Sequence, residues 1–377
     1  MLINFAAALK LLGPDAVFRL IREARPTSDY YLTTFLPEML RPTYHVEEGS
    51  MKVHATMAGL TGMDSKYPET GVISASKFLE KSAKIANQAT LTEQALRELQ
   101  EFMMRLSTSG GNVNAPKTLA LEALNFFNKV IMQPHWDTME YLKGQLFTTG
   151  EIDWTFNGME VKIDYGIPVA NKLTARTGND AYGGTASKFW TDVRLIQKAL
   201  NYAVQAYFCH PDTFDAILDN PENAIKIVEK TEFKYGNEYK ITKYEALNGV
   251  NVESSDNRDT VTIRTYGAEG ELINPADPKT TITVPFLSGG KLVGVGRPTT
   301  RGYIPGEGAT DDASRDRALG YTHIAPTVEG NGQSGRWGRL YTPESMPMQL
   351  VGQGVTNGLP VLSGPEKVVI ASTDMPA

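Results

Sequence analysis

The sequence predicts an α+β fold, because helical patterns and hairpin patterns both occur but do not alternate regularly along the chain. Three observations carry this prediction: a long helical pattern at about 115–147, a hairpin pattern at 151–165 and a strand-rich stretch at 233–300. A doubly wound sheet would instead show repeated strand–helix pairs. No repeat with a period of about 20–50 residues is present, which also argues against a solenoid.

The clearest local pattern is a β-hairpin in the run EIDWTFNGMEVKIDY, residues 151–165. Apolar and polar residues alternate on both sides of Asn157-Gly158, a dipeptide that favours the positive φ angles of a two-residue type I′ turn. Folding at this turn puts the apolar side chains on one face. The expected cross-strand pairs are Phe156 with Met159, Trp154 with Val161, and Ile152 with Ile163.

The first 50 residues are interrupted by Pro14, Pro26, Pro37 and Pro42 and contain no long periodic run. We expect an extended arm that lies on another surface. Residues 51–57 then alternate between apolar and polar, glycines and a proline follow, and apolar character resumes at residues 72–73. This pattern indicates a hairpin-like excursion with a loose tip.

Two helices are expected before the 151–165 hairpin. A Thr-x-x-Glu capping box at Thr90 and Glu93 starts an apolar stripe that runs to about Ser107. The longer helix, about 115–147, would span about 48 Å at 1.5 Å per residue, and Pro134 should kink it.

The second half of the chain is predicted to contain shorter elements. Residues 170–187 are expected to form a flexible connection and residues 191–206 an amphipathic helix, followed by a strand-to-helix step in AYFCHPDTFDAIL. Residues 301–340 are rich in glycine and polar residues and are expected to form a loop. Alternation resumes from Met346 to Leu350 and from Leu359 to Ile370.

Composition excludes several classes of protein. With 41% hydrophobic and 21% charged residues, the chain is expected to be globular, and its 377 residues can bury a substantial core. The net charge of −6 and the lack of a basic run argue against tight electrostatic binding to DNA. Cys209 is the only cysteine, so no intrachain disulfide can form. No stretch has the length and apolarity of a membrane helix, and the N-terminus lacks the basic flank of a signal peptide.

The motifs of common enzyme and metal sites are absent or have the wrong spacing. The five histidines are scattered, and Cys209-His210 is best explained as a buried thiol beside a surface or capping imidazole. The glycine-rich runs GVGRPTTRG and LSGGKL lack the spacing of nucleotide loops, and a hairpin turn is expected at the second. Asp311, Asp312 and Asp316 are expected in a solvated loop. The sequence therefore predicts no catalytic residue, no metal site and no cofactor.

Several segments, in order along the chain, resemble the lambda-type coat proteins of tailed bacteriophages, the major capsid protein E family. The segments are YYLTTFLPEML, the 51–73 excursion, GQLFTTGEIDWTFNGMEVKIDYG, WTDVRLIQKAL, YFCHPDTFDAIL, FLSGGKLVGVG and PMQLVGQGVTNGLPVLSGPEKVVIAST. The resemblance covers nearly the whole chain. It implies a Hong Kong 97-type capsid fold, with an N-terminal arm, an extended loop, a peripheral domain built on a long spine helix, and an axial domain.

The resemblance also implies a division of the chain. The expected parts are the arm at 1–50, the extended loop at 51–86, the peripheral domain at 87–168, the axial domain at 169–284, a return through the peripheral domain at 285–345 with a loop insertion at 301–340, and C-terminal strands of the axial domain at 346–377. The helical run at about 74–107 and the 301–340 loop are longer than the family pattern. No lysine, asparagine and glutamate set for covalent crosslinking can be placed.

The function implied is a major capsid protein that assembles itself, as hexamers and pentamers, into an icosahedral shell around double-stranded phage DNA. Implied partners are a portal, a scaffolding protein and a decoration protein, with DNA held without sequence specificity and no membrane; the implied location is the virion, after synthesis in the bacterial cytoplasm. Contacts between subunits are expected at Met51, Val53, Met57, Tyr67, Val72, Phe35 and Leu36. Two alternatives remain: the shell of a cellular compartment or a phage tail subunit, and an enzyme with a dispersed active site.

Overall fold

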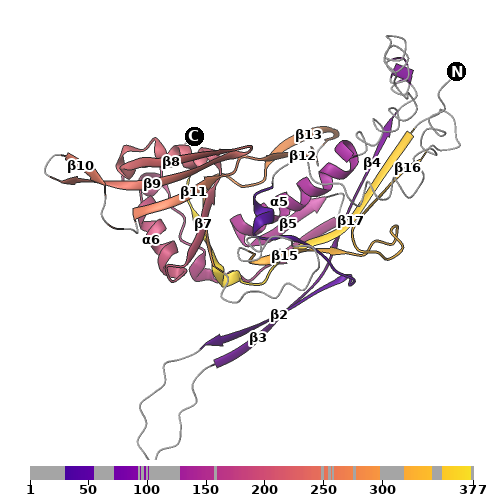
Figure 1. Ribbon diagram of the computed structural model, residues 1–377, viewed down its shortest axis with the longest axis horizontal. Helices are drawn as coiled ribbons and strands as arrows, with labels where there is room; N and C mark the ends of the chain where they lie inside the picture. The colour runs from indigo at the N-terminus through magenta and orange to yellow at the C-terminus, as the bar shows by residue number, and fades with distance from the viewer. Residues whose placement is uncertain are drawn as a thin grey trace, which may run out of the picture.

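The computed structural model describes residues 30–54, 72–91, 94, 97–98, 101, 128–156, 159–247, 250–253, 256, 259–274, 277–297, 318–341 and 350–374. Two β-sheets lie side by side, and a long helix, α5, crosses the region between them (Figure 1). A two-stranded hairpin, β2–β3, projects away from both sheets (Figure 1).

The first sheet has five strands built around the longest of the described strands. Its members are β1 (Glu38–Leu40), β15 (Gly320–Ala325), β17 (Leu350–Leu362), β16 (Arg336–Tyr341) and β4 (Ala83–Leu91). β17 pairs antiparallel with β4 on one side and with β15 and β16 in succession on the other. β1 adds to β15 in parallel. This sheet therefore joins the N-terminal segment to three segments that are distant in sequence.

The second sheet has seven strands. Its members are β8 (Ile225–Phe233), β9 (Gly236–Leu247), β10 (Val250–Glu253), β11 (Thr260–Thr265), β7 (Val204–Cys209), β14 (Lys291–Gly296) and β18 (Val368–Ser372). β7 pairs parallel with β11 and antiparallel with β14, and β14 pairs with β18. The helices α6 (Phe189–Ala199) and α7 (Pro211–Leu218) flank β7 in sequence and supply apolar side chains to the same core.

Three two-stranded sheets and several short helical turns complete the described structure. The hairpins are β2 (His45–His54) with β3 (Val72–Lys81), β5 (Glu151–Phe156) with β6 (Met159–Asp164), and β12 (Glu269–Asn274) with β13 (Asp277–Pro285). The 3₁₀ turns are η1 (Leu32–Thr34), η3 (Val169–Asn171), η4 (Gly178–Asp180), η5 (Pro221–Asn223) and η7 (Pro365–Lys367). The β5–β6 register pairs Phe156 with Met159 and Ile152 with Ile163, which confirms the predicted hairpin and its register.

Helix α5 (Gln133–Thr149) follows directly on a π-helical turn, η2 (Asn128–Met132). Pro134 is the second residue of α5, directly beyond the π-helical turn and Gln133, so the proline lies where the helix type changes. The helix ends at Thr149, because Gly150 adopts a left-handed φ of 81° and its N–H bonds to the carbonyl of Leu146. Helical backbone from residue 128 to Thr149 confirms the second half of the predicted helix, and the expected start at about residue 115 lies outside the described residues.

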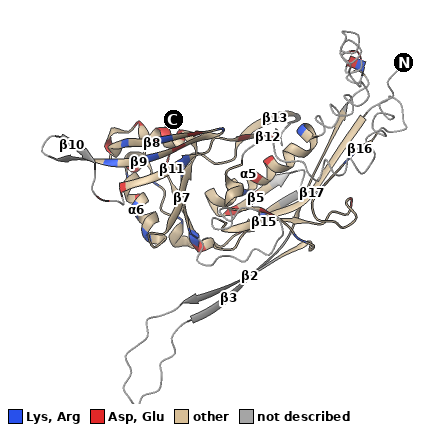
Figure 2. Cartoon of the chain, viewed as in Figure 1, with Lys and Arg blue, Asp and Glu red and all other residues tan. Residues whose placement is uncertain are grey.

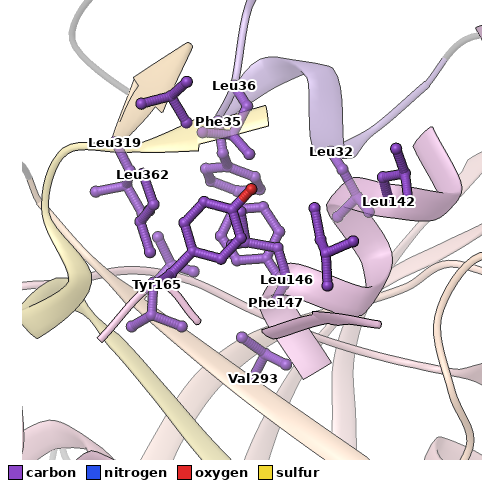
Figure 3. Packing of buried hydrophobic residues seen from close by; sticks show 14 of the residues in the cluster. Leu32, Phe35, Leu36, Leu142, Leu146, Phe147, Tyr165, Val293, Leu319 and Leu362 are labelled. Atoms are coloured by element: carbon purple, nitrogen blue, oxygen red, sulfur yellow. The ribbon is translucent and has the colours of Figure 1, made fainter. Parts of the chain in front are cut away.

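The main hydrophobic core lies where α5 meets both sheets (Figure 3). Helix α5 supplies Leu142, Leu146 and Phe147, and β7 supplies Phe208. Phe147 and Phe208 meet edge to face, with ring centroids 5.6 Å apart. Because one cluster contains side chains of the arm, the helix and both sheets, these parts form a single folded unit.

The expected helical run at 74–107 is wrong over its first half. Residues 74–91 form strands β3 and β4, and the capping-box Thr90 is itself in β4, paired with Val351. The run AKIANQATL has the composition of a helix, but pairing with β17 along all nine residues overrides that preference. Helical backbone is found at Gln94, Arg97, Glu98 and Glu101, and the rest of the predicted stripe lies outside the described residues.

Other segments also differ from expectation. The predicted 301–340 loop contains β15, which is fully buried, and β16. The 170–187 connection is tied to the C-terminal strand, since the N–H groups of Leu173 and Arg176 bond to the carbonyls of Ile370 and Ser372. The helix predicted at 191–206 ends at Ala199, before β7. The LSGGKL turn leads from β13 in one sheet to β14 in another, so it is not a hairpin turn.

The expected division of the chain does not follow the sheets after residue 285. β14 falls within the predicted 285–345 return through the peripheral domain, yet it pairs with β7 and β18 in the seven-stranded sheet. The C-terminal segment 346–377 is shared, with β17 in the five-stranded sheet and β18 in the seven-stranded one. The chain therefore crosses between the two sheets more often than the sequence pattern indicated.

Candidate assembly surface

The β2–β3 hairpin is the most isolated described element. Each strand has ten residues, so at about 3.3 Å per residue the hairpin is about 33 Å long. Within the described ranges, neither strand pairs with a third strand. A two-stranded hairpin is marginally stable in water by itself, so an element of this shape needs a surface to lie on.

Hydrogen bonds close the base of the hairpin and fix it to the five-stranded sheet. The carbonyl of Tyr44 accepts from the N–H and the hydroxyl of Ser82, at 3.3 and 3.0 Å. His323 Nε2 donates to the carbonyl of Thr43 at 2.9 Å, and Asn357 Nδ2 donates to the Tyr44 hydroxyl at 2.9 Å. Burial lowers the pKa of His323, which keeps its ring neutral. The hairpin therefore projects from a fixed base.

Three of the predicted contact residues lie on this hairpin. Met51 and Val53 are in β2, where they pair with Ala75 and Ile73, and Val72 begins β3. Met57 and Tyr67 fall in the segment between the strands, which lies outside the described residues. The structure thus brings Met51, Val53 and Val72 together on one projecting element, and their role in contacts between subunits stays a prediction.

Phe35 and Leu36 require a correction. Both are buried in the core of their own chain, with exposed fractions of 2% and 0%. The Phe35 ring packs against Phe147 and Phe208, with centroids 5.9 and 5.6 Å apart. Apolar residues in a proline-rich segment suggested a surface arm, but the segment from Tyr30 to Leu40 closes the core instead. Neither side chain is available to a neighbouring subunit.

A shallow groove of about 650 Å³ crosses one face of the five-stranded sheet. A ladder of polar side chains forms part of its floor: Arg339 Nε donates to Gln353 Oε1 at 2.8 Å, and Gln353 Nε2 donates to Gln88 Oε1 at 2.7 Å. Its rim includes Trp337 and the Lys84–Glu329 ion pair. The groove therefore presents exposed hydrogen-bonding groups beside an aromatic side chain.

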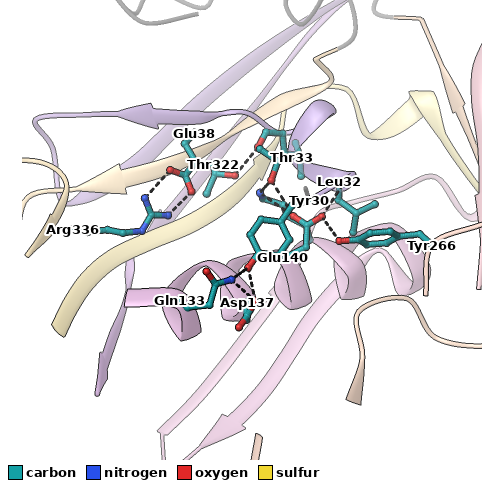
Figure 4. A network of polar contacts seen from close by, with 12 residues as sticks. Tyr30, Leu32, Thr33, Glu38, Gln133, Asp137, Glu140, Tyr266, Thr322 and Arg336 are labelled. Atoms are coloured by element: carbon teal, nitrogen blue, oxygen red, sulfur yellow. Dashed lines mark hydrogen bonds and ion pairs between the residues drawn. The ribbon is translucent and has the colours of Figure 1, made fainter. Parts of the chain in front are cut away.

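An ion pair joins β1, in the N-terminal segment, to β16 of the same sheet. Arg336 in β16 forms two hydrogen bonds with the Glu38 carboxylate in β1, one of them 2.8 Å long (Figure 4). Burial alone would raise the pKa of Glu38, but the ion pair and hydrogen bonds with Arg336 outweigh it and hold the pKa below its usual value. The Arg336 guanidinium also lies over the Trp136 ring of α5, 4.6 Å from the centroid.

Glu140 in α5 is the centre of a buried polar network (Figure 4). Its carboxylate accepts from the N–H of Leu32 at 2.8 Å, the hydroxyl of Thr33 at 3.0 Å and the hydroxyl of Tyr266 at 3.1 Å. Lys143 Nζ lies 3.3 Å from the same carboxylate and is also buried. Burial and the adjacent Glu140 raise the pKa of Tyr266, so this phenol stays protonated and donates. The network joins the arm, the helix and the segment after β11.

His135 links α5 to β4. Its Nε2 is 2.9 Å from Asn87 Oδ1, and Asn87 Nδ2 donates to the carbonyl of Ile131 in the π-helical turn. Burial, with a smaller contribution from Arg336, lowers the pKa of His135 to about 3, so the ring is neutral. A neutral ring can donate from Nε2 to the amide oxygen, which fixes the helix start against the sheet.

No three His, Cys, Asp or Glu side chains in the described ranges are placed to share a metal ion. Cys209 is buried with a raised pKa, and His210 Nδ1 accepts from the N–H of Asp212 as the N-cap of α7, in agreement with the sequence prediction. Asp311, Asp312 and Asp316 lie outside the described residues.

Acidic and basic residues are interspersed among β8, β9, α6 and α5 in the view of Figure 2. Among the described helices, none has both the length and the apolar character needed to cross a membrane. These observations leave the projecting hairpin, its base and the groove as the features that most need a functional explanation.

Sequence reasoning missed Glu140 and the strands around the groove. Glu140 looks like an ordinary helical glutamate, and nothing in the local sequence marks it as buried. A signal did exist for β15, since GYTHIA is a short apolar run with β-forming residues. Its glycine- and polar-rich surroundings concealed it.

Comparison with known proteins gives a fold but no sequence relative. No family model matches the sequence, and no curated protein matches it. Among solved structures, the chain is similar to a protein assigned as a prophage capsid protein of Escherichia coli CFT073, with a TM-score of 0.50, 12% identity and 99% of each chain covered. This likeness shows the fold alone. The predicted α+β, Hong Kong 97-type capsid fold is confirmed.

Two further structures are similar at lower scores. The mature capsid of bacteriophage PhiM1 has a TM-score of 0.43 and 8% identity, with 94% of this chain and 90% of that chain covered. An encapsulin, SrpI of Synechococcus elongatus, has a TM-score of 0.41 and 10% identity, with 100% and 98% covered.

Proposed function

We propose that this chain is the major capsid protein of a tailed bacteriophage, and that copies of it assemble into an icosahedral shell around double-stranded DNA. The observation that carries the proposal is the β2–β3 hairpin, which has a base fixed to the five-stranded sheet and no third strand to pair with in the described structure. The fold supports the same reading, since the solved structure of similar fold is assigned as a prophage capsid protein.

In this proposal, the hairpin of one subunit lies on the five-stranded sheet of the next. The groove beside Gln88, Gln353 and Arg339 offers exposed donors and acceptors of the kind that an extended backbone uses. A contact between two unlike surfaces can repeat from one subunit to the next. It produces a closed ring or shell when the rotation that relates successive subunits brings the last one back to the first. Each contact can be weak, because many of them act together in a shell.

The wider assignment follows from the same proposal. Hexamers and pentamers of the chain would form the shell, a portal, scaffolding and decoration protein would complete it, and synthesis would take place in the bacterial cytoplasm. The net charge of −6 suits a container that holds DNA without binding it tightly. We assign no catalytic, metal or cofactor role to any residue.

The test is deletion of residues 57–70, between the two strands of the hairpin. The expected result is a folded chain with the thermal stability of the full-length subunit that no longer forms shells. The control is Val169→Asp in η3, an exposed site outside the hairpin, which should leave assembly intact. Regular shells formed by the 57–70 deletion would refute the proposed role of the hairpin.

A further inference from the structure

Three polar side chains form a row across one face of the five-stranded sheet, in the groove described above. Arg339 of β16 is paired with Gln353 of β17, and Gln353 is paired with Gln88 of β4. Residues paired across antiparallel strands lie on the same face of a sheet. Asn87, the next residue of β4, points to the other face and contacts His135 of α5. The row of Arg339, Gln353 and Gln88, named here the polar ladder, therefore lies on the face that α5 does not cover.

Arg339 fixes the direction of both hydrogen bonds in the polar ladder, because a guanidinium group has donors and no acceptor. Its Nε requires the oxygen of the Gln353 amide, which lies 2.8 Å away. The NH₂ group of Gln353 is thereby turned towards Gln88, whose amide oxygen accepts at 2.7 Å. The NH₂ group of Gln88 is left at the end of the ladder.

The polar ladder consequently has donors without acceptors at both ends. Within the described ranges, no group accepts a hydrogen bond from Gln88 Nε2 or from the two terminal nitrogens of Arg339. Each amide oxygen of the ladder, by contrast, already accepts one hydrogen bond. The group that best complements this surface is therefore rich in acceptors.

The charges of the groove favour the same kind of ligand. Arg339 and Lys84 line the groove together with one acidic side chain, Glu329. The hydrogen bond from Lys84, 2.5 Å long, lowers the pKa of Glu329, so this carboxylate is ionised and already paired. Its second oxygen, Oε2, is buried. The groove thus carries one net positive charge on a chain whose net charge is −6.

Arg339 is also held in position by the side chains on either side of it in β16. Its guanidinium lies over the Tyr341 ring, 4.5 Å from the centroid, and 5.8 Å from the centroid of Trp337. A planar guanidinium can pair with both oxygens of a carboxylate through parallel hydrogen bonds. Because the side chain is already ordered, such binding costs little conformational entropy.

We propose that the groove is a carboxylate-binding site, in which the terminal nitrogens of Arg339 hold the carboxylate and Gln88 Nε2 donates to a further oxygen of the same ligand. In the assembled protein, a second copy of the chain supplies this group. A second copy fits because the chain has 43 acidic and 37 basic residues, so its overall charge is opposite to that of the groove. The source of the carboxylate rests on the proposed function, whereas the site itself does not.

The first experiment tests the site on the unassembled subunit, with acetate as the probe. Phenylglyoxal modifies guanidinium groups, and peptide mass spectrometry gives the rate of modification at Arg339. Compared with chloride at equal ionic strength, acetate should slow this rate by the factor 1 + [acetate]/Kd, which is about threefold at twice the Kd. Arg194 is the internal control, because it already pairs with Asp259 at 2.8 Å and its rate should not change.

Two results of this experiment would overturn the inference. One is a rate at Arg339 that is the same in acetate and in chloride. The other is a rate that a fragment of double-stranded DNA slows and acetate does not, since the ligand would then be a nucleic-acid phosphate.

The second experiment changes the end of the polar ladder. Gln88→Glu keeps the acceptor for Gln353 but replaces the terminal donor with a negative charge. The subunit should keep the wild-type melting temperature, while acetate no longer protects Arg339 and shells no longer form. The control is Asn201→Asp, which makes the same change of charge on an exposed residue in the turn after α6 and should assemble like the wild type.

Shells of Gln88→Glu that match the wild type in yield and regularity would overturn the assignment of a second copy as the source of the carboxylate. If the wild-type chain forms no shell, the proposed function fails. The acetate measurement then decides the carboxylate site alone, because it uses the unassembled subunit.

Discussion

Replacing Glu140 with glutamine is expected to destabilise the subunit through the buried network at the junction of the arm, α5 and the segment after β11. The substitution keeps the size of the side chain but removes its charge. Lys143, which is as deeply buried, would lose its counter-ion. The N–H of Leu32 and the hydroxyls of Thr33 and Tyr266 would compete for one remaining amide oxygen.

The magnitude follows from the burial of both charged groups. Breaking a fully buried ion pair by removing one partner costs about 3–5 kcal/mol, because the other charge stays desolvated. For a chain of 377 residues, an unfolding entropy of about 2.1 cal/mol/K per residue converts this cost into a melting temperature about 4–6 °C lower.

The assay is thermal unfolding of the unassembled subunit, so that contacts between copies do not contribute. The control is the double variant Glu140→Gln with Lys143→Met, which removes both charges and should recover most of the lost stability. The single variant Lys143→Met completes the cycle. A Glu140→Gln subunit as stable as the wild type, or a double variant no better than Glu140→Gln, would refute the reasoning.

Three further predictions concern stability. Gly144→Ala should destabilise the subunit by about 1–3 kcal/mol or more, although alanine favours helices, because the added Cβ would lie 1.7 Å from the carbonyl oxygen of Phe286; a gain of stability in urea unfolding would contradict the packing. The pKa of His135 is 6.5 in the unfolded chain and about 3 in the folded chain. Its contribution to the free energy of unfolding is therefore complete above pH 6.5 and declines as the pH falls, by up to about 1.4 kcal/mol per pH unit. His135→Gln should therefore lose less stability than the wild type between pH 7 and pH 5 in denaturant titrations, and identical losses would exclude this role. The pKa of Glu38 is lowered in the folded chain, so its contribution to the free energy of unfolding is present above the unfolded value of 4.5 and is lost as the pH falls. In the Arg336→Met variant, the free energy of unfolding should therefore fall less steeply below pH 4.5 than in the wild type. An equally steep fall would count against the ion pair.

The sequence predicted elements whose signals are local. The 151–165 hairpin was predicted in type and register, because Asn157-Gly158 fixes the turn and alternation fixes the faces. The strand-to-helix step at β7 and α7 was also predicted, since Pro211 marks the helix start. The fold class followed from the order of such elements and from the family resemblance.

Elements that depend on distant partners could not be predicted. β4 has a helical composition and becomes a strand only because β17, more than 250 residues later, pairs with it over its whole length. Phe35 and Leu36 looked like contact residues of a free arm, since nothing local shows that α5 and β7 bury them.

Electron microscopy of the full chain, expressed alone and imaged at high protein concentration after gel filtration, tests the central claim most directly. The account predicts closed shells, or tubes and sheets with a hexameric lattice, and their loss when residues 57–70 are deleted. A small oligomer of fixed size, unchanged across salt and protein concentration, would contradict the claim that this chain forms a shell.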